Sequence, residues 1–175
     1  MPKAQRLIVT SGLPGTGKST IAEGLARAFA VPVFSVDPIE AAMWRSGLVP
    51  EDTGIAAYRV AEAMAGENLA QGLSVIVDAV NPVADARAMW RALSEQHHVP
   101  LKMIEIICSD EVIHRKRIEG RVRNIEGMPE VDWERVAERK AEYQAWTNDR
   151  LILDSAIDAP DVLIARAVDY CKPTR

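Results

Sequence analysis

The sequence predicts a three-layer α/β fold, with a five-stranded parallel sheet between layers of helices. Two observations predict it: short apolar segments alternate with segments of helical periodicity, and polar side chains follow the apolar segments. Strands that alternate with helices join into parallel sheets through right-handed crossovers. The chain has 175 residues, of which 48% are hydrophobic and 26% charged, enough for one domain with a substantial core. We therefore expect a single domain over residues 1–175.

Five apolar segments are predicted as strands. The first is apolar without alternation up to Ser11, as expected for a parallel strand buried on both faces. The second is short and ends at Asp37, because the following Pro38 cannot continue a strand but suits the first turn of a helix. The predicted strands cover residues 6–11, 31–36, 73–77, 101–108 and 150–154.

Seven segments are predicted as helices, with residues typical of helix ends at their boundaries. Asp37 and Thr53 are the expected N-caps of the second and third helices, and Gly72 follows the third. Ser109 or Asp110 is the expected cap of a strongly basic fifth helix. Loops are expected over residues 47–54 and 124–129, and helices over residues 18–30, 39–45, 55–70, 84–96, 110–123, 132–146 and 161–170.

A glycine-rich segment lies between the first strand and the first helix. Residues 12–19, which we call the phosphate loop, match Gly-x-x-x-x-Gly-Lys-[Ser/Thr] at every fixed position. Glycines let such a loop curl so that backbone N–H groups face phosphate oxygens, and the following helix directs its N-terminal dipole at the same anion. Lys18 is expected to reach the β- and γ-phosphates of ATP, and the Ser19 hydroxyl to bind Mg²⁺. The structural alternative is an ordinary glycine turn between the strand and the helix.

Polar residues end four of the predicted strands on one edge of the sheet, where ligands bind in parallel α/β folds. These residues are Gly12, Asp37, Asp78 and the pair Ser109–Asp110. Asp37 is a candidate general base for a substrate hydroxyl, with a helix N-cap as the structural alternative. Asp78 is expected to hold Mg²⁺ or to contact the acceptor, with an ordinary turn as the alternative.

Two classes of nucleotide-binding protein are disfavoured. None of the six lysines lies in the Asn/Thr-Lys-x-Asp element with which GTP switches bind guanine. Ala79 follows Asp78, where a motor ATPase usually carries a glutamate that polarises water. A small phosphotransferase is therefore the favoured class.

A basic helix and the residues after it supply candidate phosphate contacts. Arg117 and Arg121 lie four residues apart, on one helical face, and guanidinium groups stabilise the charge that develops in phosphoryl transfer. Residues 121–133, which we call the lid, are expected to exclude water by closing over the site. The alternative is a solvated basic face that pairs with neighbouring glutamates.

These motifs together resemble the P-loop kinase branch, which includes adenylate kinase, gluconate kinase, chloramphenicol phosphotransferase, zeta toxins and the 5′-kinase domain of polynucleotide kinase. The resemblance covers essentially the whole chain and implies a three-layer P-loop NTPase fold with a small helical lid. It implies that Arg117 packs on adenine, that Arg121 contacts phosphates and that Asp37 accepts the proton of the substrate hydroxyl. The similarity of residues 117–121 to the start of the adenylate kinase lid carries the first two roles.

We therefore expect an ATP- and Mg²⁺-dependent kinase that acts on a hydroxyl group of a small or medium-sized acceptor. The alternatives are a polynucleotide 5′-hydroxyl kinase and a nucleotide-binding regulator without an acceptor. The predicted catalytic residues are Lys18, Asp37 and Arg121, and the predicted metal ligands are Ser19 and Asp78. The predicted nucleotide-binding residues are Gly12, Leu13, Pro14, Gly15, Thr16, Gly17, Lys18, Ser19, Thr20, Arg117 and Arg121, and the predicted acceptor-binding residues are Asp37, Arg45, Asp78 and Arg87.

Composition narrows the partners further. The net charge is −4, so no broad basic field indicates nucleic acid as an obligate partner, and no apolar stretch approaches the length of a membrane span. Cys108 and Cys171 show neither metal-ligand spacing nor a disulfide framework, which predicts a reducing compartment. We expect a cytoplasmic protein.

Overall fold

A computed structural model describes residues 5–173 of the chain, so the ends of the single domain expected over 1–175 lie outside the described residues. Its centre is a five-stranded, all-parallel sheet in the order β2-β3-β1-β4-β5. The strands are β1 (Leu7–Ser11), β2 (Val33–Ser35), β3 (Val75–Asp78), β4 (Leu101–Ile107) and β5 (Leu151–Asp154). The predicted sheet is confirmed.

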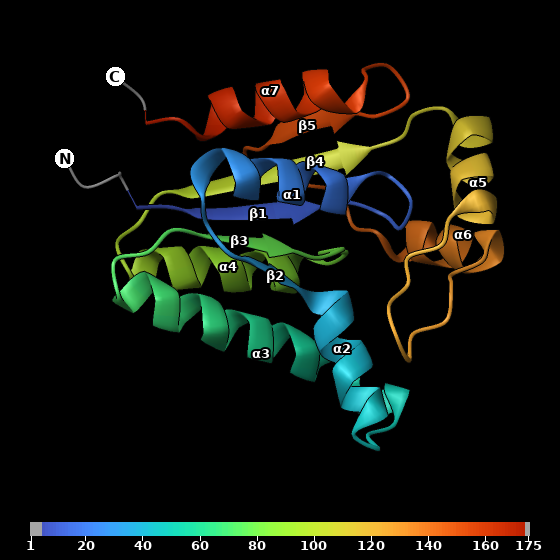
Figure 1. The fold of residues 1–175 in the computed structure, drawn as a ribbon, viewed down its shortest axis with the longest axis horizontal. Helices are drawn as coiled ribbons and strands as arrows, with labels where there is room; N and C mark the ends of the chain where they lie inside the picture. Colours follow the sequence, from blue (N-terminus) through green and yellow to red (C-terminus); the bar gives the residue numbers. More distant parts are fainter. Residues whose placement is uncertain (1–4, 174–175) are drawn as a thin grey trace.

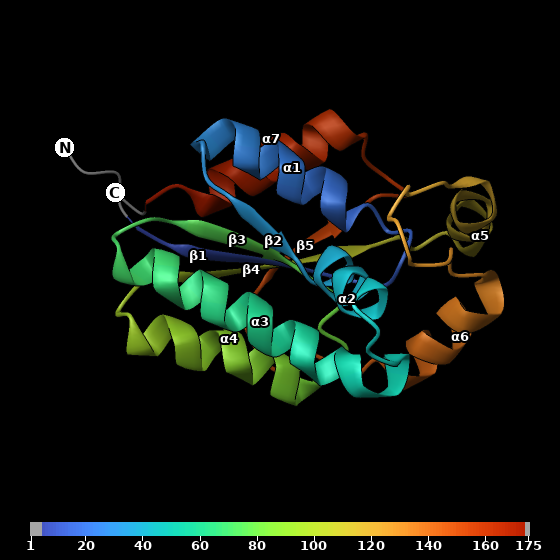
Figure 2. The same cartoon turned by 60° about the horizontal axis from the view of Figure 1, so that its bottom comes forward.

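Helices cover both faces of the sheet. In Figures 1 and 2, α1 and α7 lie on one face and α3 and α4 on the other, whereas α2, α5 and α6 lie beyond the carboxyl ends of the strands. The helices are α1 (Lys18–Phe29), α2 (Val36–Arg45), α3 (Pro50–Ala70), α4 (Ala84–Gln96), α5 (Glu111–Gly120), α6 (Trp133–Glu142) and α7 (Pro160–Cys171).

The core has two halves because successive side chains of a buried strand point to opposite faces. In β1, Leu7 and Val9 pack toward α3 and α4, and Ile8 packs toward α1 and α7. Small side chains let α3 approach the sheet closely, because a stripe of alanines at four-residue spacing is fully buried: Ala57, Ala61 and Ala65. Burial on both faces explains why the first strand is continuously apolar.

Several predicted helix boundaries were wrong. Asp37 is not the N-cap of α2, because the helix starts one residue earlier and Asp37 lies in its first turn. Thr53 is not a cap either, since α3 begins at Pro50, a favoured first residue, and the expected loop over 47–54 is shorter. The buried Thr53 hydroxyl instead donates to Glu40 over 3.0 Å and accepts from the Trp44 indole over 2.7 Å. The side chain that was predicted to cap α3 thus connects α2 to α3 through hydrogen bonds.

Helices α5 and α6 are shorter than predicted. Helix α5 ends at Gly120 and α6 at Glu142, and the residues directly after them, Arg121 and Tyr143, have extended backbone conformations. Both begin at aspartate caps: Asp110 accepts from the N–H of Ile113 over 3.0 Å, and Asp132 accepts from the N–H of Arg135 over 2.8 Å. Within residues 5–173, no helix combines the length and apolarity needed to cross a membrane.

Candidate active site

The phosphate loop adopts backbone conformations that only glycine takes readily. Gly12 has a φ of +141° and Gly15 a φ of +81°. A Cβ atom at Gly12 would collide with the carbonyl oxygen of Ile106, and one at Gly15 would lie 2.5 Å from Cδ1 of Ile118. No side chain caps the N-terminus of α1, which starts at Lys18, within the last two residues of the loop motif. The first N–H groups of α1 are therefore available to an anion.

Lys18 curls back over the loop. Its ammonium group donates to the Leu13 carbonyl oxygen over 3.3 Å. Burial lowers the pKa of Lys18, and the carboxylates of Asp78 and Asp37 act in the opposite direction. Lys18 therefore lies within electrostatic reach of both acids that the sequence predicted for the site.

Asp78 lies at the centre of a cluster of hydroxyl groups. Its carboxylate accepts from Ser19 over 2.7 Å, from Thr10 over 2.9 Å and from Ser35 over 3.3 Å, and the residue is 6% exposed. Parallel register sets this arrangement, because Asp78 of β3 pairs with Thr10 of β1 and with Ser35 of β2. The structure thus brings Ser19 and Asp78 together, as predicted from the motif and the strand end.

This donor set fits Mg²⁺. The ion prefers oxygen ligands and commonly takes one or two from protein, the rest coming from phosphate and water. Ser19 and Asp78 would supply such a pair beside the loop. Among the described residues, no group of three or more His, Cys, Asp or Glu side chains could hold a metal by itself, so phosphate oxygens would have to complete the shell.

Asp37 faces the phosphate loop from the first turn of α2 and is held by the lid. Its carboxylate accepts from a guanidinium nitrogen of Arg123 over 2.7 Å, and 43% of its side chain is exposed. Arg123 is also tied to Glu130, across the lid, over 3.2 Å. The candidate base is therefore oriented by a side chain that the lid carries.

Arg117 lies where α5 meets the loop after β5. It donates to the hydroxyl and to the carbonyl oxygen of Ser155, each over 2.7 Å. A cavity of about 240 Å³ opens between Arg117, Thr20 and Pro160, beside the phosphate loop. This position suits the base-packing role that the resemblance implies for Arg117.

Two partly buried guanidinium groups near the site have nitrogen atoms without a hydrogen-bond partner among the described residues. They are Nε and Nη2 of Arg121 and Nε of Arg139. The Arg121 Nε atom nevertheless forms an ion pair with a carboxylate oxygen of Glu130 at 3.4 Å, which leaves Nη2 as its buried nitrogen without any partner among the described residues. Burial and the neighbouring charge of Arg123 lower the pKa of Arg121. Buried cations with unused donors favour an anion such as a phosphate group.

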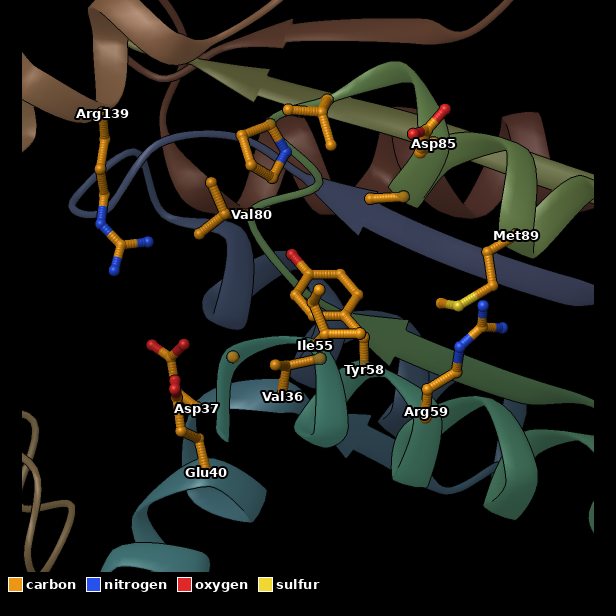
Figure 3. A pocket seen from close by; sticks show the side chains of 14 residues that line it. Val36, Asp37, Glu40, Ile55, Tyr58, Arg59, Val80, Asp85, Met89 and Arg139 are labelled. Carbon is orange, nitrogen blue, oxygen red and sulfur yellow. The ribbon is translucent and has the colours of Figure 1, made fainter. Parts of the chain in front are cut away.

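A larger cavity of about 560 Å³ lies between α2, α3, α4 and the segment after β3, and we call it the acceptor cavity (Figure 3). Asp37 and Arg139 stand at one end, and Arg59, Asp85 and Met89 at the other. A second cavity of about 470 Å³ runs under the lid and shares four lining residues with the first: Asp37, Glu40, Val80 and Arg139. Asp37 and Arg139 therefore stand where the two cavities meet.

Three of the four residues predicted to bind the acceptor do not line this cavity. Asp78 lies instead in the hydroxyl cluster beside Ser19. Arg45 is exposed and donates to the carbonyl oxygen of Glu126, so it supports the lid. Arg87 is 2% exposed, and its guanidinium donates to four backbone carbonyl oxygens. These acceptors belong to Asn81, Pro82, Gln144 and Ala145. Trp146 and Tyr143 stack on the Arg87 guanidinium at 4.1 and 5.0 Å, so its role is structural.

Sequence reasoning missed three contributors. Arg123 pairs with Asp37, from which it is separated by 86 positions in the sequence. Nothing in the sequence distinguishes Arg139 from the other charged residues of its helix. His114 is buried against the phosphate loop, where its Nε2 lies 2.7 Å from the Pro14 carbonyl oxygen and its ring meets Trp133 edge-on at 5.2 Å. Only the density of basic residues over 114–123 pointed to this region.

Known proteins share this fold. A family model described as an AAA domain matches residues 7–146. The uncharacterized protein Rv2004c of Mycobacterium tuberculosis strain H37Rv is 31% identical over 119 residues, which are 61% of this chain and 24% of that protein. The chain thus spans about a quarter of the length of the curated relatives it matches.

Two solved structures superpose on nearly the whole chain. An unliganded sugar kinase from Janibacter sp. HTCC2649 has a TM-score of 0.70 and 23% identity, and covers 95% of this chain and 94% of its own. The Mycobacterium tuberculosis APS kinase CysC in complex with AMPPNP and APS has a TM-score of 0.69 and 18% identity, and covers 97% of this chain and 98% of its own. The predicted three-layer P-loop NTPase fold is confirmed.

Proposed function

We propose that this chain, which belongs to the AAA domain family, is an ATP- and Mg²⁺-dependent kinase that transfers the γ-phosphoryl group of ATP to a hydroxyl group of a small or medium-sized acceptor. One observation carries the proposal. Asp37 and Arg139 line both the acceptor cavity and the cavity under the lid, and Asp37 is electrostatically coupled to Lys18. A hydroxyl group in the acceptor cavity would therefore meet a base beside the phosphate-binding lysine.

The proposed reaction needs positioning more than covalent chemistry. The phosphate loop and Lys18 hold the triphosphate, and Asp37 accepts the proton of the acceptor hydroxyl. The acceptor oxygen bonds to the γ-phosphorus as the bond to the β-phosphate oxygen breaks, and ADP leaves. Mg²⁺, held by Ser19 and Asp78, would neutralise charge on the β- and γ-phosphates.

The two partly unpaired guanidinium groups have a place in this scheme. Arg139 borders both cavities at the Asp37 end, and Arg121, beside Glu130 of the lid, lies within electrostatic reach of Asp37. Each has a buried guanidinium nitrogen without a hydrogen-bond partner among the described residues. Charge spreads over the peripheral phosphoryl oxygens during transfer, and pre-positioned cations stabilise it. We assign both arginines to these oxygens, and the cavity beside Arg117 to the nucleotide base.

The test is removal of the phosphate-binding cation. Lys18→Ala should reduce MgATP affinity and abolish phosphoryl transfer while the fold survives, because the phosphates lose their main positive partner. Calorimetry with MgATP and a turnover assay measure the two effects. The matched control is Lys116→Ala, on the exposed side of α5, which should behave as wild type. Equal binding and turnover in Lys18→Ala would reject the assignment.

A further inference from the structure

The volume of the acceptor cavity limits the size of the acceptor molecule that it can hold. Its volume of about 560 Å³ falls in the range of about 300–1,000 Å³ that drug-sized ligands occupy. The cavity extends from Asp37 at one end to Met89 at the other (Figure 3). An acceptor that fills it therefore has a body reaching well beyond the reacting hydroxyl group.

The walls of the cavity are apolar along most of this length. Side chains from α3, the segment after β3 and α4 supply them: Ile55, Val80, Pro82, Val83, Ala86 and Met89. Ile55 is 81% exposed although it borders the cavity. Covering such a side chain with an apolar ligand surface contributes roughly 25 cal/mol per Å².

The charges at the end of the cavity remote from Asp37 are unfavourable for a negatively charged group of the acceptor. At the end remote from Asp37, the guanidinium group of Arg59 is already paired with Glu62 at 2.7 Å. The Asp85 carboxylate borders the same end, and it has no ion-pair or hydrogen-bond partner within residues 5–173. A negatively charged group placed there would face the unpaired Asp85 carboxylate, and the charge of Arg59 is already partly compensated by Glu62.

From these walls and charges we infer that the acceptor is an alcohol with an apolar body and no negative charge, rather than a sugar acid or a phosphorylated sugar. The inference rests on the proposed function and specifies its substrate. The hydroxyl group lies at the Asp37 end, the apolar body lies along Val80, Ile55 and Met89, and the far end of the molecule is neutral or cationic.

The experiment compares matched acceptors on the full chain with MgATP. A set of neutral aryl and alkyl alcohols, biphenylethanol among them, is assayed beside the same skeletons bearing a remote carboxylate, and beside gluconate. We expect kcat/KM for each neutral alcohol to exceed that of its carboxylate partner about tenfold or more, since burying an unpaired charge is costly.

A pair of variants on α4 localises the effect. Ala86→Lys places an ammonium group in the apolar wall, and should lower kcat/KM for the neutral alcohols about tenfold while moving the preference toward the carboxylate partners. Ala88→Lys, exposed on the same helix and outside the cavity, should retain the wild-type preference. A misfolded variant would lose its activity toward neutral and carboxylate acceptors alike. A reversal of preference therefore reports a change in the cavity itself.

The outcomes separate the two claims. If MgATP binds and gluconate or the carboxylates are the better acceptors, the inference is overturned and the proposed kinase stands. If MgATP binds and no alcohol of any kind accepts phosphate, or if MgATP does not bind, the proposed function falls and the inference falls with it.

Discussion

Asp37 is a half-exposed side chain that one cation orients and a second one influences electrostatically. Arg123 pairs with it directly, and Lys18 lies within electrostatic reach. A carboxylate held in this way keeps one orientation toward the mouth of the acceptor cavity, where a hydroxyl proton would be released.

Asp37→Asn tests this role. The amide keeps the size of the side chain but cannot take a proton, so kcat should fall by at least about a hundredfold while MgATP affinity changes little. Steady-state kinetics and calorimetry measure the two quantities. Glu40→Gln is the comparison, because Glu40 borders the same cavity on the next turn of α2. A kcat for Asp37→Asn near that of wild type would reduce Asp37 to a structural partner of Arg123.

At the scale of elements, α5 is fastened to the phosphate loop by His114. Burial lowers the pKa of His114, the hydrogen bond to the Pro14 carbonyl raises it, and the charges of Lys140, Arg117 and Lys18 lower it. The folded state therefore holds neutral imidazole at a pH where the unfolded chain, with a histidine pKa of about 6.5, already binds a proton.

The sign of the pH dependence follows from this difference. Since the unfolded chain binds more protons, the contribution of His114 to stability is complete above about pH 6.5 and is lost as the pH falls toward the lower pKa of the folded state. Urea unfolding measures the free energy of unfolding at about pH 8 and about pH 5.5. Its decrease at the lower pH should be smaller for His114→Gln than for wild type. The control is His98→Gln, exposed at the end of α4, whose free energy of unfolding should decrease as much as that of wild type. Equal losses in all three proteins would contradict the assignment.

The sequence predicted the order of the strands and helices better than the residues at which they begin and end. Every strand and helix was anticipated in order, because a buried parallel strand is continuously apolar and each helix repeats its buried positions. The cap at Asp110 was one of two candidates, with Ser109, because both directly precede the basic helix, whereas Asp132 was predicted as the first residue of its helix and is its cap. Asp37 and Thr53 were misread as caps, since their neighbours Val36 and Pro50 start the helices earlier.

The parts of the candidate site that could be predicted are those that a single motif or a single strand end determines. The phosphate loop, Ser19 and Asp78 meet because β1 and β3 are neighbours in the sheet. The lid contacts were not predictable, since Arg123 and Asp37 are distant in the chain and only the folding of residues 121–133 onto α2 joins them. Arg87 was misassigned because its partners are backbone carbonyls, which leave no trace in the side-chain pattern.

At the scale of the whole molecule, Arg87 joins the two sides of the acceptor cavity. It connects the segment after β3 with residues 144–145, which follow α6, and so fixes α6 and Arg139 relative to the sheet. A fully buried charge with several hydrogen bonds cannot be removed without leaving carbonyl groups unpaired.

Arg87→Met should therefore lower the free energy of unfolding by about 3 kcal/mol or more. Its effect should be on stability and not on acceptor affinity alone, so chemical denaturation is the measurement, with Arg91→Met on the same helix as the control. An Arg87→Met protein of wild-type stability whose KM for the acceptor alone rises would restore the earlier expectation that Arg87 binds the acceptor.

The most direct test of the central claim follows phosphorus itself. Phosphorus NMR of the full chain with MgATP and the set of neutral alcohols should show ADP and a new phosphomonoester resonance growing together, one for one, and neither should appear with Lys18→Ala. Release of inorganic phosphate alone, or unchanged ATP with the neutral alcohols, with their carboxylate partners and with gluconate alike, would contradict the claim that this chain is a kinase.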